Sequence, residues 1–150
     1  MKDQSAALTA VASDVRAGSR GAVLLAGAAG AAAASAAATL AADLATTVVR
    51  LDLNAVVSKY IGETEKNIDR VFADAERAGS VILVDEADAL FGSRTGVKDA
   101  HDRYANLDTS HLLARLEEYD GLAILATNLR TNIDPAFSRR LRRVIDYTPR

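Results

Sequence analysis

Hydrophobic and polar residues follow one another along this chain in a pattern that predicts strands and helices in turn. Apolar residues at helical spacing predict helices over residues 2–16 and 63–78, and a third one over residues 112–119. The alanines that follow Gly30 predict another helix, because alanine is the strongest helix former. Short apolar or β-branched runs predict five strands, at residues 22–26, 46–51, 81–84, 122–126 and 144–147.

The order of these elements predicts an α/β fold. Residues 81–84 are apolar at every position, which is typical of a strand buried on both faces. Strands that alternate with helices form a parallel sheet with helices on both sides. We therefore expect a single domain over residues 1–150, and we expect ligands to bind at the carboxyl ends of its strands.

Composition and charge agree with a compact globular domain and exclude several kinds of site. Hydrophobic residues make up 49% of the chain and charged residues 25%, unlike a disordered protein. The formal net charge of -2 gives no reason to expect a nucleic-acid partner. Because the chain has no cysteine, disulfides, thiol nucleophiles and thiolate metal sites are all excluded.

Alanine is the unusual feature of the composition. The chain has 31 alanines, 11 of which fall within residues 28–42, and no charged residue occurs within residues 21–42. Twenty-two uncharged residues satisfy the length criterion for a membrane span, with Arg16 and Arg20 before them as a positive flank. However, alanine is only weakly apolar and Gly27 and Gly30 interrupt the run, so a buried strand followed by a helix is the alternative interpretation.

Polar side chains follow two of the predicted strands directly. Asp85 and Glu86 come after residues 81–84, and Asn128 comes after the fourth strand. In a nucleotide-hydrolysing site the first carboxylate would hold Mg²⁺ and the second would orient the attacking water, while the amide would bind a phosphate or that water. The alternatives are an acidic helix N-terminus and a capped turn.

A basic cluster precedes the predicted fifth strand. It consists of Arg139, Arg140, Arg142 and Arg143. Guanidinium groups suit bidentate contact with phosphates, particularly across a subunit boundary. The alternative interpretation is a solvated basic turn.

Taken in order, these segments resemble the AAA+ ATPase core module of the P-loop NTPase superfamily, and the resemblance covers residues 21–147. Residues 81–86 are similar to the Walker B motif, and Asn128 corresponds to sensor 1. Residues 133–142 are similar to the arginine-finger segment, with Arg139 and Arg142 at the family's finger spacing. The first pore loop, whose aromatic residue grips a polypeptide, corresponds to Lys59, Tyr60, Ile61 and Gly62.

The resemblance implies a three-layer α/β/α fold with a five-stranded parallel sheet, and ATP hydrolysis with Mg²⁺ held by Asp85. It gives catalytic roles to Glu86, Asn128, Arg139 and Arg142. It also implies a polypeptide substrate, hexameric rings and a cytoplasmic location, with no membrane or nucleic-acid partner. Three segments, SKYIGETEKN, DEADALFG and VKDAHDRYAN, look most like AAA+ proteins associated with bacterial contractile injection systems.

The phosphate-binding loop departs from the family pattern G-x-x-G-x-G-K-[ST]. Gly27 and Gly30 hold the first two glycine positions, but alanine stands at the next three defining positions, Ala32, Ala33 and Ala34. The lysine ammonium at Ala33 and the metal-binding hydroxyl at Ala34 are therefore missing. Alanine would also be strained at position 32 if that position needed a left-handed backbone, and an alanine run favours a helix that extends back into the loop.

From this departure we expect weak or absent nucleotide binding and hydrolysis. The chain also stops at Arg150, before the helical lid that the family carries, so we expect a monomer. The alternative is a non-catalytic α/β scaffold or interaction module, either engineered or descended from an ATPase.

Overall fold

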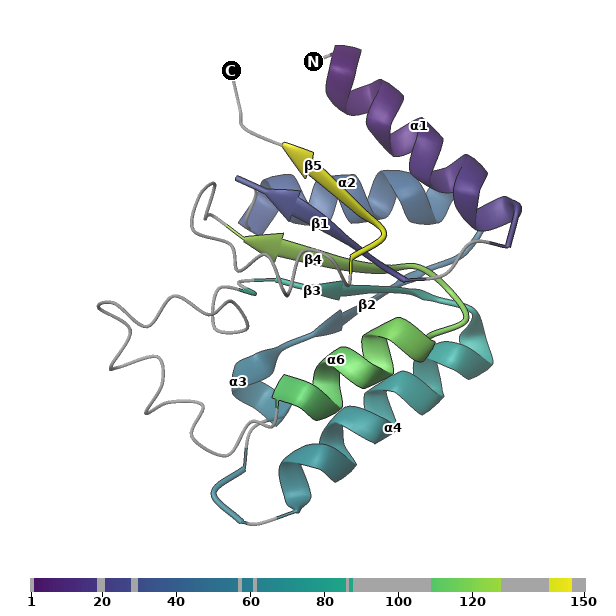
Figure 1. Ribbon diagram of the computed structural model, residues 1–150. Helices are drawn as coiled ribbons and strands as arrows, with labels where there is room; N and C mark the ends of the chain where they lie inside the picture. The colour runs from purple at the N-terminus through teal and green to yellow at the C-terminus, as the bar shows by residue number, and fades with distance from the viewer. Residues whose placement is uncertain are drawn as a thin grey trace.

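The computed structural model describes residues 2–18, 21–27, 30–56, 58–60, 62–85, 87, 109–127 and 141–146 (Figure 1). Its helices are α1 (Lys2–Arg16), α2 (Gly30–Asp43), α3 (Leu53–Val56), α4 (Glu63–Ala78) and α6 (Thr109–Glu118). Its strands are β1 (Ala22–Ala26), β2 (Val48–Leu51), β3 (Val81–Val84), β4 (Ala123–Thr127) and β5 (Arg143–Asp146).

The five strands form a single sheet in the order β2-β3-β4-β1-β5, and each pair of neighbours is parallel. Parallel neighbours cannot be joined by a tight turn, so the chain must cross over between them, here largely by helices. The predicted five-stranded parallel sheet is confirmed. Its three central strands β3, β4 and β1 are buried at every described position.

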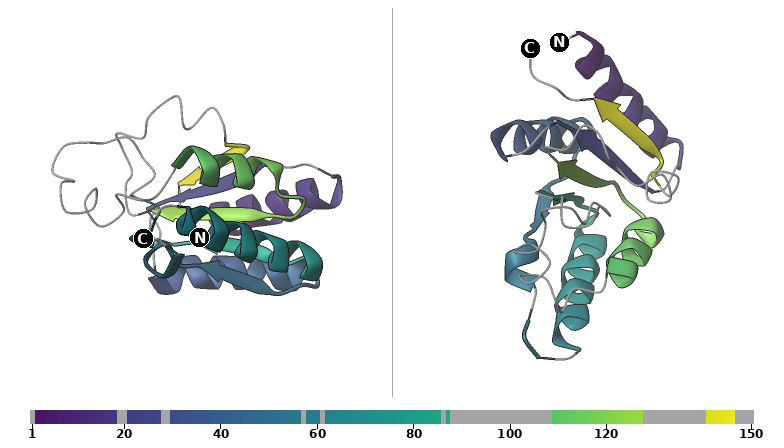
Figure 2. Two further views of the ribbon diagram at one scale, coloured as in Figure 1. Left: turned by 90° about the horizontal axis from the view of Figure 1, so that it is seen from below. Right: turned by 60° about the vertical axis from the view of Figure 1, so that its left-hand side comes forward.

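Apolar side chains cover both faces of the sheet, because successive residues of a strand point to opposite faces. Leu24 of β1 packs in a cluster with residues of α4 and α6, while its neighbours Val23 and Leu25 pack with residues of α1 and α2. In the right-hand view of Figure 2, α4 and α6 lie side by side, away from α1 and α2. The fold is therefore the expected three-layer α/β/α arrangement.

The uncharged stretch of residues 21–42 contains β1 and all but the last residue of α2. The buried side of α2 is made of small residues and one leucine: Ala33, Ala36, Ala37, Leu40 and Ala41. Among the described residues, no helix combines the length and the apolar character needed to cross a membrane.

The start of β2 differs from the prediction. Thr46 and Thr47 belong to a β-branched run, but the strand begins at Val48. The Thr46 hydroxyl donates to the carbonyl oxygen of Gly79 at 2.7 Å, and the hydroxyls of Thr47 and Ser80 lie 2.8 Å apart. The two threonines thus join the turn before β3 through their side chains. The single-turn helix α3 was not predicted, because four residues show no periodicity.

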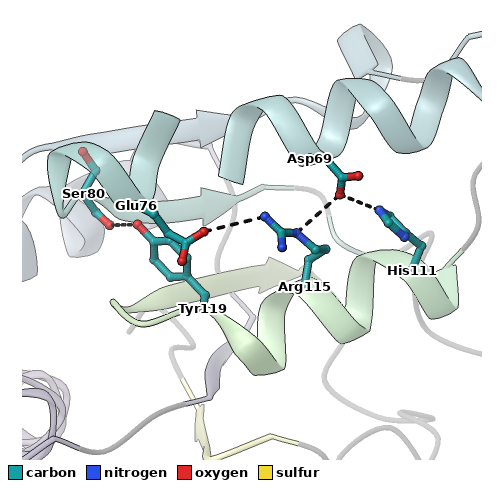
Figure 3. A network of polar contacts seen from close by, with 6 residues as sticks. All are labelled: Asp69, Glu76, Ser80, His111, Arg115 and Tyr119. Carbon is teal, nitrogen blue, oxygen red and sulfur yellow. Dashed lines mark hydrogen bonds and ion pairs between the residues drawn. The ribbon is translucent and has the colours of Figure 1, made fainter. Parts of the chain in front are cut away.

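Polar side chains join α4 to α6 (Figure 3). His111 Nε2 and Arg115 Nε of α6 lie 2.7 Å and 3.4 Å from the same carboxylate oxygen of Asp69. Arg115 also reaches Glu76 at 3.7 Å, and its guanidinium lies 5.2 Å from the centre of the buried Phe72 ring. These contacts hold the two helices together, since each partner comes from the opposite helix.

Tyr119, which directly follows α6, contacts α4 and the residue before β3. Its ring packs edge-on against the Phe72 ring at 5.7 Å, and its hydroxyl donates to the carbonyl oxygen of Ser80 at 2.5 Å (Figure 3). Only 2% of the residue is exposed. Burial raises the pKa of Tyr119 to about 12, and the negative charges of Glu76 and Asp120 act in the same direction.

Candidate functional site

The candidate site lies at the carboxyl edge of the sheet, where β1, β3 and β4 end. Ala26 of β1 pairs with Thr127 of β4, and the next residue, Gly27, donates its N–H to the Thr127 carbonyl oxygen at 2.7 Å. Val84 of β3 pairs with Leu125, so Asp85 extends from the same edge. The structure therefore brings the start of the phosphate loop and the predicted metal-binding carboxylate together.

The phosphate loop is short in this protein because α2 begins at Gly30. Motif positions 30–34 are therefore all helical, as the alanine run predicted. The positive φ angles of this segment fall on glycines, at 91° for Gly27 and 57° for Gly30. Ala32 has no positive φ, so alanine carries no left-handed strain there.

The two positions that carry the lysine and the hydroxyl in the family motif differ in their surroundings. Ala33 is completely buried, in the cluster that also holds Val23 and Leu25 of β1. Ala34 is exposed. Both residues end in a methyl group, so neither can donate a hydrogen bond to a phosphate or ligate a metal.

Among the residues that the structure describes, Asp85 is the most buried charged group of this edge, with 7% of the residue exposed. Its Oδ2 atom accepts a hydrogen bond from the backbone N–H of Gly30 at 3.0 Å. The same atom lies 3.5 Å from Nη2 of Arg50. The first amides of a helix have no partner within the helix and carry partial positive charge, so a carboxylate is stabilised in this position.

The contact between Arg50 and Asp85 was not predicted from the sequence. It lies on β2 opposite Leu83 of β3, one pair before the end of the strand, and 64% of its side chain is exposed. A signal was present, since Arg50 interrupts a run of β-branched and apolar residues. However, only the β2–β3 register shows which carboxylate it faces.

The predicted pore-loop segment precedes α4. Tyr60 is 60% exposed, and Nζ of Lys59 lies 5.6 Å from the centre of its ring. The Tyr60 N–H donates to Oγ of Ser58 at 3.1 Å, and the Ser58 hydroxyl donates to the Glu63 carboxylate at 3.0 Å. Gly62, with φ of 85°, leads into the helix. The aromatic ring is thus displayed to solvent from a turn that is braced against α4.

Several predicted site residues lie outside the described part of the chain. They are Ile61, Glu86, Asn128 and Arg139. Their roles stay predictions.

Comparison with known proteins shows to which family the chain belongs. The profile of the ATPase family associated with various cellular activities (AAA) matches residues 23–149, which include all but the first residue of β1, as well as Asp85 and β5. The chain belongs to the AAA ATPase family. ATP and Mg²⁺ are the ligands that membership of this family generally implies.

Curated relatives of this AAA domain include proteasomal ATPases. It is 34% identical to the proteasome-activating nucleotidase of Aeropyrum pernix over 131 residues, 83% of this chain and 32% of that protein. It is 33% identical to the 26S proteasome subunit RPT4 of Saccharomyces cerevisiae over 122 residues, 78% of this chain and 28% of that protein. An uncharacterized AAA family ATPase of Sinorhizobium fredii is 30% identical over 126 residues, 84% of this chain and 38% of that protein. The AAA domain therefore spans about a third of the length of these relatives.

The loop of this AAA domain lacks two side-chain groups that the family motif directs at phosphate and metal. A triphosphate needs donors at the N-terminus of α2, but the Gly30 N–H already donates to Asp85. The methyl groups of Ala33 and Ala34 offer no replacement for the ammonium and the hydroxyl of the motif.

Arg142 lies at the other edge of the sheet from Asp85. Its N–H donates to the carbonyl oxygen of Ala22, the first residue of β1, at 2.9 Å. Its side chain is 9% exposed and lies 3.9 Å from the Asp14 carboxylate of α1. Burial lowers the pKa of Arg142, although the Asp14 charge partly opposes this effect. The guanidinium is therefore buried within the domain, away from the Asp85 edge, and the finger role of Arg142 stays a prediction.

Proposed function

We propose that this chain is the core of an AAA ATPase of the protein-remodelling type whose phosphate loop no longer holds nucleotide with ordinary strength. The observation that carries the proposal is the run Ala32, Ala33 and Ala34 at the loop positions that contact phosphates and metal, beside a retained Asp85. Hydrogen bonds to charged groups contribute about 1.5–3 kcal/mol each. Loss of the lysine alone therefore corresponds to about ten- to a hundredfold weaker binding.

The geometry of the loop supports this proposal. The side chain at position 33 is buried against the sheet, and the N–H of Gly30 is engaged by Asp85. The Gly30 contact engages one backbone donor at the N-terminus of α2, and the methyl group of Ala33 offers none. Hydrolysis through Glu86 and Asn128 would be impaired for the same reason, because it requires bound nucleotide.

The remaining functional assignments are also proposals. A polypeptide substrate agrees with the exposed Tyr60 ring and with the proteasomal names of the relatives. A narrower proposal rests on the resemblance of SKYIGETEKN and DEADALFG to AAA+ proteins of contractile injection systems, a group to which none of the relatives named above belongs. Family members form hexameric rings, but we propose that this chain alone is a monomer in solution.

A titration with a fluorescent ATP analogue and Mg²⁺ tests the proposal. The chain as it stands is compared with the restored variant Ala32→Gly, Ala33→Lys, Ala34→Thr. We expect the restored variant to bind at least about tenfold more tightly, because it regains the ammonium and the hydroxyl. The variant Ala38→Lys is a matched control, since it adds the same charge at an exposed position of α2 and should leave the affinity unchanged.

The possible results separate the candidate functions. Equally tight binding by the chain as it stands contradicts the proposal. If the restored variant is folded by circular dichroism but does not bind, the chain is better described as a non-catalytic scaffold. Sedimentation with nucleotide tests the assembly, and a discrete hexamer would contradict the expected monomer.

A further inference from the structure

The carboxylate of Asp85 and the N-terminus of α2 are joined across 55 residues of sequence. The bond runs from the Gly30 N–H to Asp85 Oδ2 at 3.0 Å, and Arg50 approaches the same oxygen at 3.5 Å from β2. Asp85 is thus a nearly buried anion placed between a helix N-terminus and a guanidinium.

The carboxylate of Asp85 hinders the binding of a second anion at the N-terminus of α2. The Gly30 N–H is a single donor, so it cannot serve both Asp85 and an incoming phosphate with full strength. The negative charge of Asp85 also repels a phosphate near the helix end, and solvent screens this repulsion weakly because the carboxylate is buried. A phosphate would have to displace Asp85 from Gly30 or bind beside it against this repulsion.

We propose that Asp85 is an internal competitor of phosphate: it occupies the N-terminus of α2 and opposes the binding of a second anion there. Arg50 balances the charge of Asp85 on the side of β2 and so stabilises the contact between Asp85 and Gly30. This inference rests on the proposed function and deepens it, because the loop is then weakened by a contact that is present as well as by side chains that are missing.

Binding of inorganic tripolyphosphate in the presence of EDTA tests the competition without any metal. Asp85→Ala removes both the charge and the acceptor, whereas Asp85→Asn removes the charge and keeps an oxygen of the same shape. We expect both variants to bind tripolyphosphate more tightly than the chain as it stands, by about tenfold for Asp85→Ala. The charge-matched control is Asp74→Asn on α4, which removes an exposed carboxylate that pairs with Arg77 and should leave the affinity unchanged.

Amide hydrogen exchange at Gly30 gives a second readout. Loss of its acceptor should speed up exchange of the Gly30 N–H in Asp85→Ala, while exchange in Asp74→Asn stays as in the unchanged chain. If Asp85→Ala does not fold, Asp85→Asn alone provides the binding comparison, because its amide oxygen can still accept from Gly30.

Unchanged affinity in both Asp85 variants would overturn the proposal, and so would an equal gain in Asp74→Asn, which would reveal an effect of net charge only. The proposed function is judged separately, by the affinity of the unchanged chain for the ATP analogue with Mg²⁺. Tight binding of the ATP analogue would refute the proposed weak nucleotide binding. The competition by Asp85 would still be tested by the ratio of tripolyphosphate affinities between the Asp85 variants and the unchanged chain.

Discussion

Replacing Tyr119 by phenylalanine should change how the stability of this domain depends on pH. The hydroxyl donates to the Ser80 carbonyl oxygen at 2.5 Å in a site that is 2% exposed, so its removal leaves that buried acceptor without this donor. Such a loss costs about 1 kcal/mol of unfolding free energy. At pH 8 the Tyr119→Phe variant is therefore expected to be less stable than the unchanged chain by about that amount.

The difference should shrink at high pH, because the pKa of Tyr119 is raised by burial from 10.0 to about 12. A raised pKa in the folded state means that the neutral hydroxyl is favoured in the fold. Its stabilising effect is fully present below pH 10 and is lost as the pH rises from 10 to 12. For a shift of this size the unchanged chain loses about 1.4 kcal/mol more unfolding free energy than the phenylalanine variant between pH 8 and pH 11.

Urea denaturation followed by circular dichroism at pH 8 and pH 11 measures both quantities. The control is Tyr60→Phe, which deletes a hydroxyl from a side chain that is 60% exposed, and it should differ from the unchanged chain equally at both pH values. The reasoning fails if the unchanged chain and Tyr119→Phe lose the same stability between pH 8 and pH 11.

Two further substitutions test the packing of α4. Gly79 ends this helix with φ of 67° and open space around it, so Gly79→Ala adds no clash but places alanine in the left-handed region. We expect the unfolding free energy to fall by about 1 kcal/mol in thermal unfolding. An unchanged melting temperature would contradict this. Phe72 is fully buried against Tyr119 and Arg115, so Phe72→Ala should cost roughly 3–5 kcal/mol in urea denaturation. A cost below about 1 kcal/mol would show that the cavity collapses and that the ring is not a central part of the core.

Much of the fold could be predicted from local patterns. Residues 81–84 are apolar throughout, and they form the buried strand β3, because a strand covered on both faces leaves its sequence no polar position. The same reasoning does not give the exact residues at which a strand begins and ends. Thr46 and Thr47 have high strand propensity, yet their hydroxyls bond to Gly79 and Ser80, and such contacts depend on where β3 begins in space.

The candidate site shows a similar division. The sequence predicted that Asp85 would stand near the phosphate loop, because strand ends of a parallel sheet share one edge. It did not predict Arg50, since a charged residue on an edge strand is usually explained by solvent. The pairing of Arg50 with Leu83 places its guanidinium beside Asp85, and no spacing rule within the chain contains that register.

The residue types alone establish which groups the side chains at positions 33 and 34 lack. A methyl group at Ala33 and Ala34 can neither donate to a phosphate nor ligate a metal, whatever fold surrounds it. What the neighbouring polar groups do depends on how the chain folds. Gly30 and Asp85 meet because β1 and β3 lie in one parallel sheet, and their hydrogen bond depends on that arrangement rather than on either residue alone.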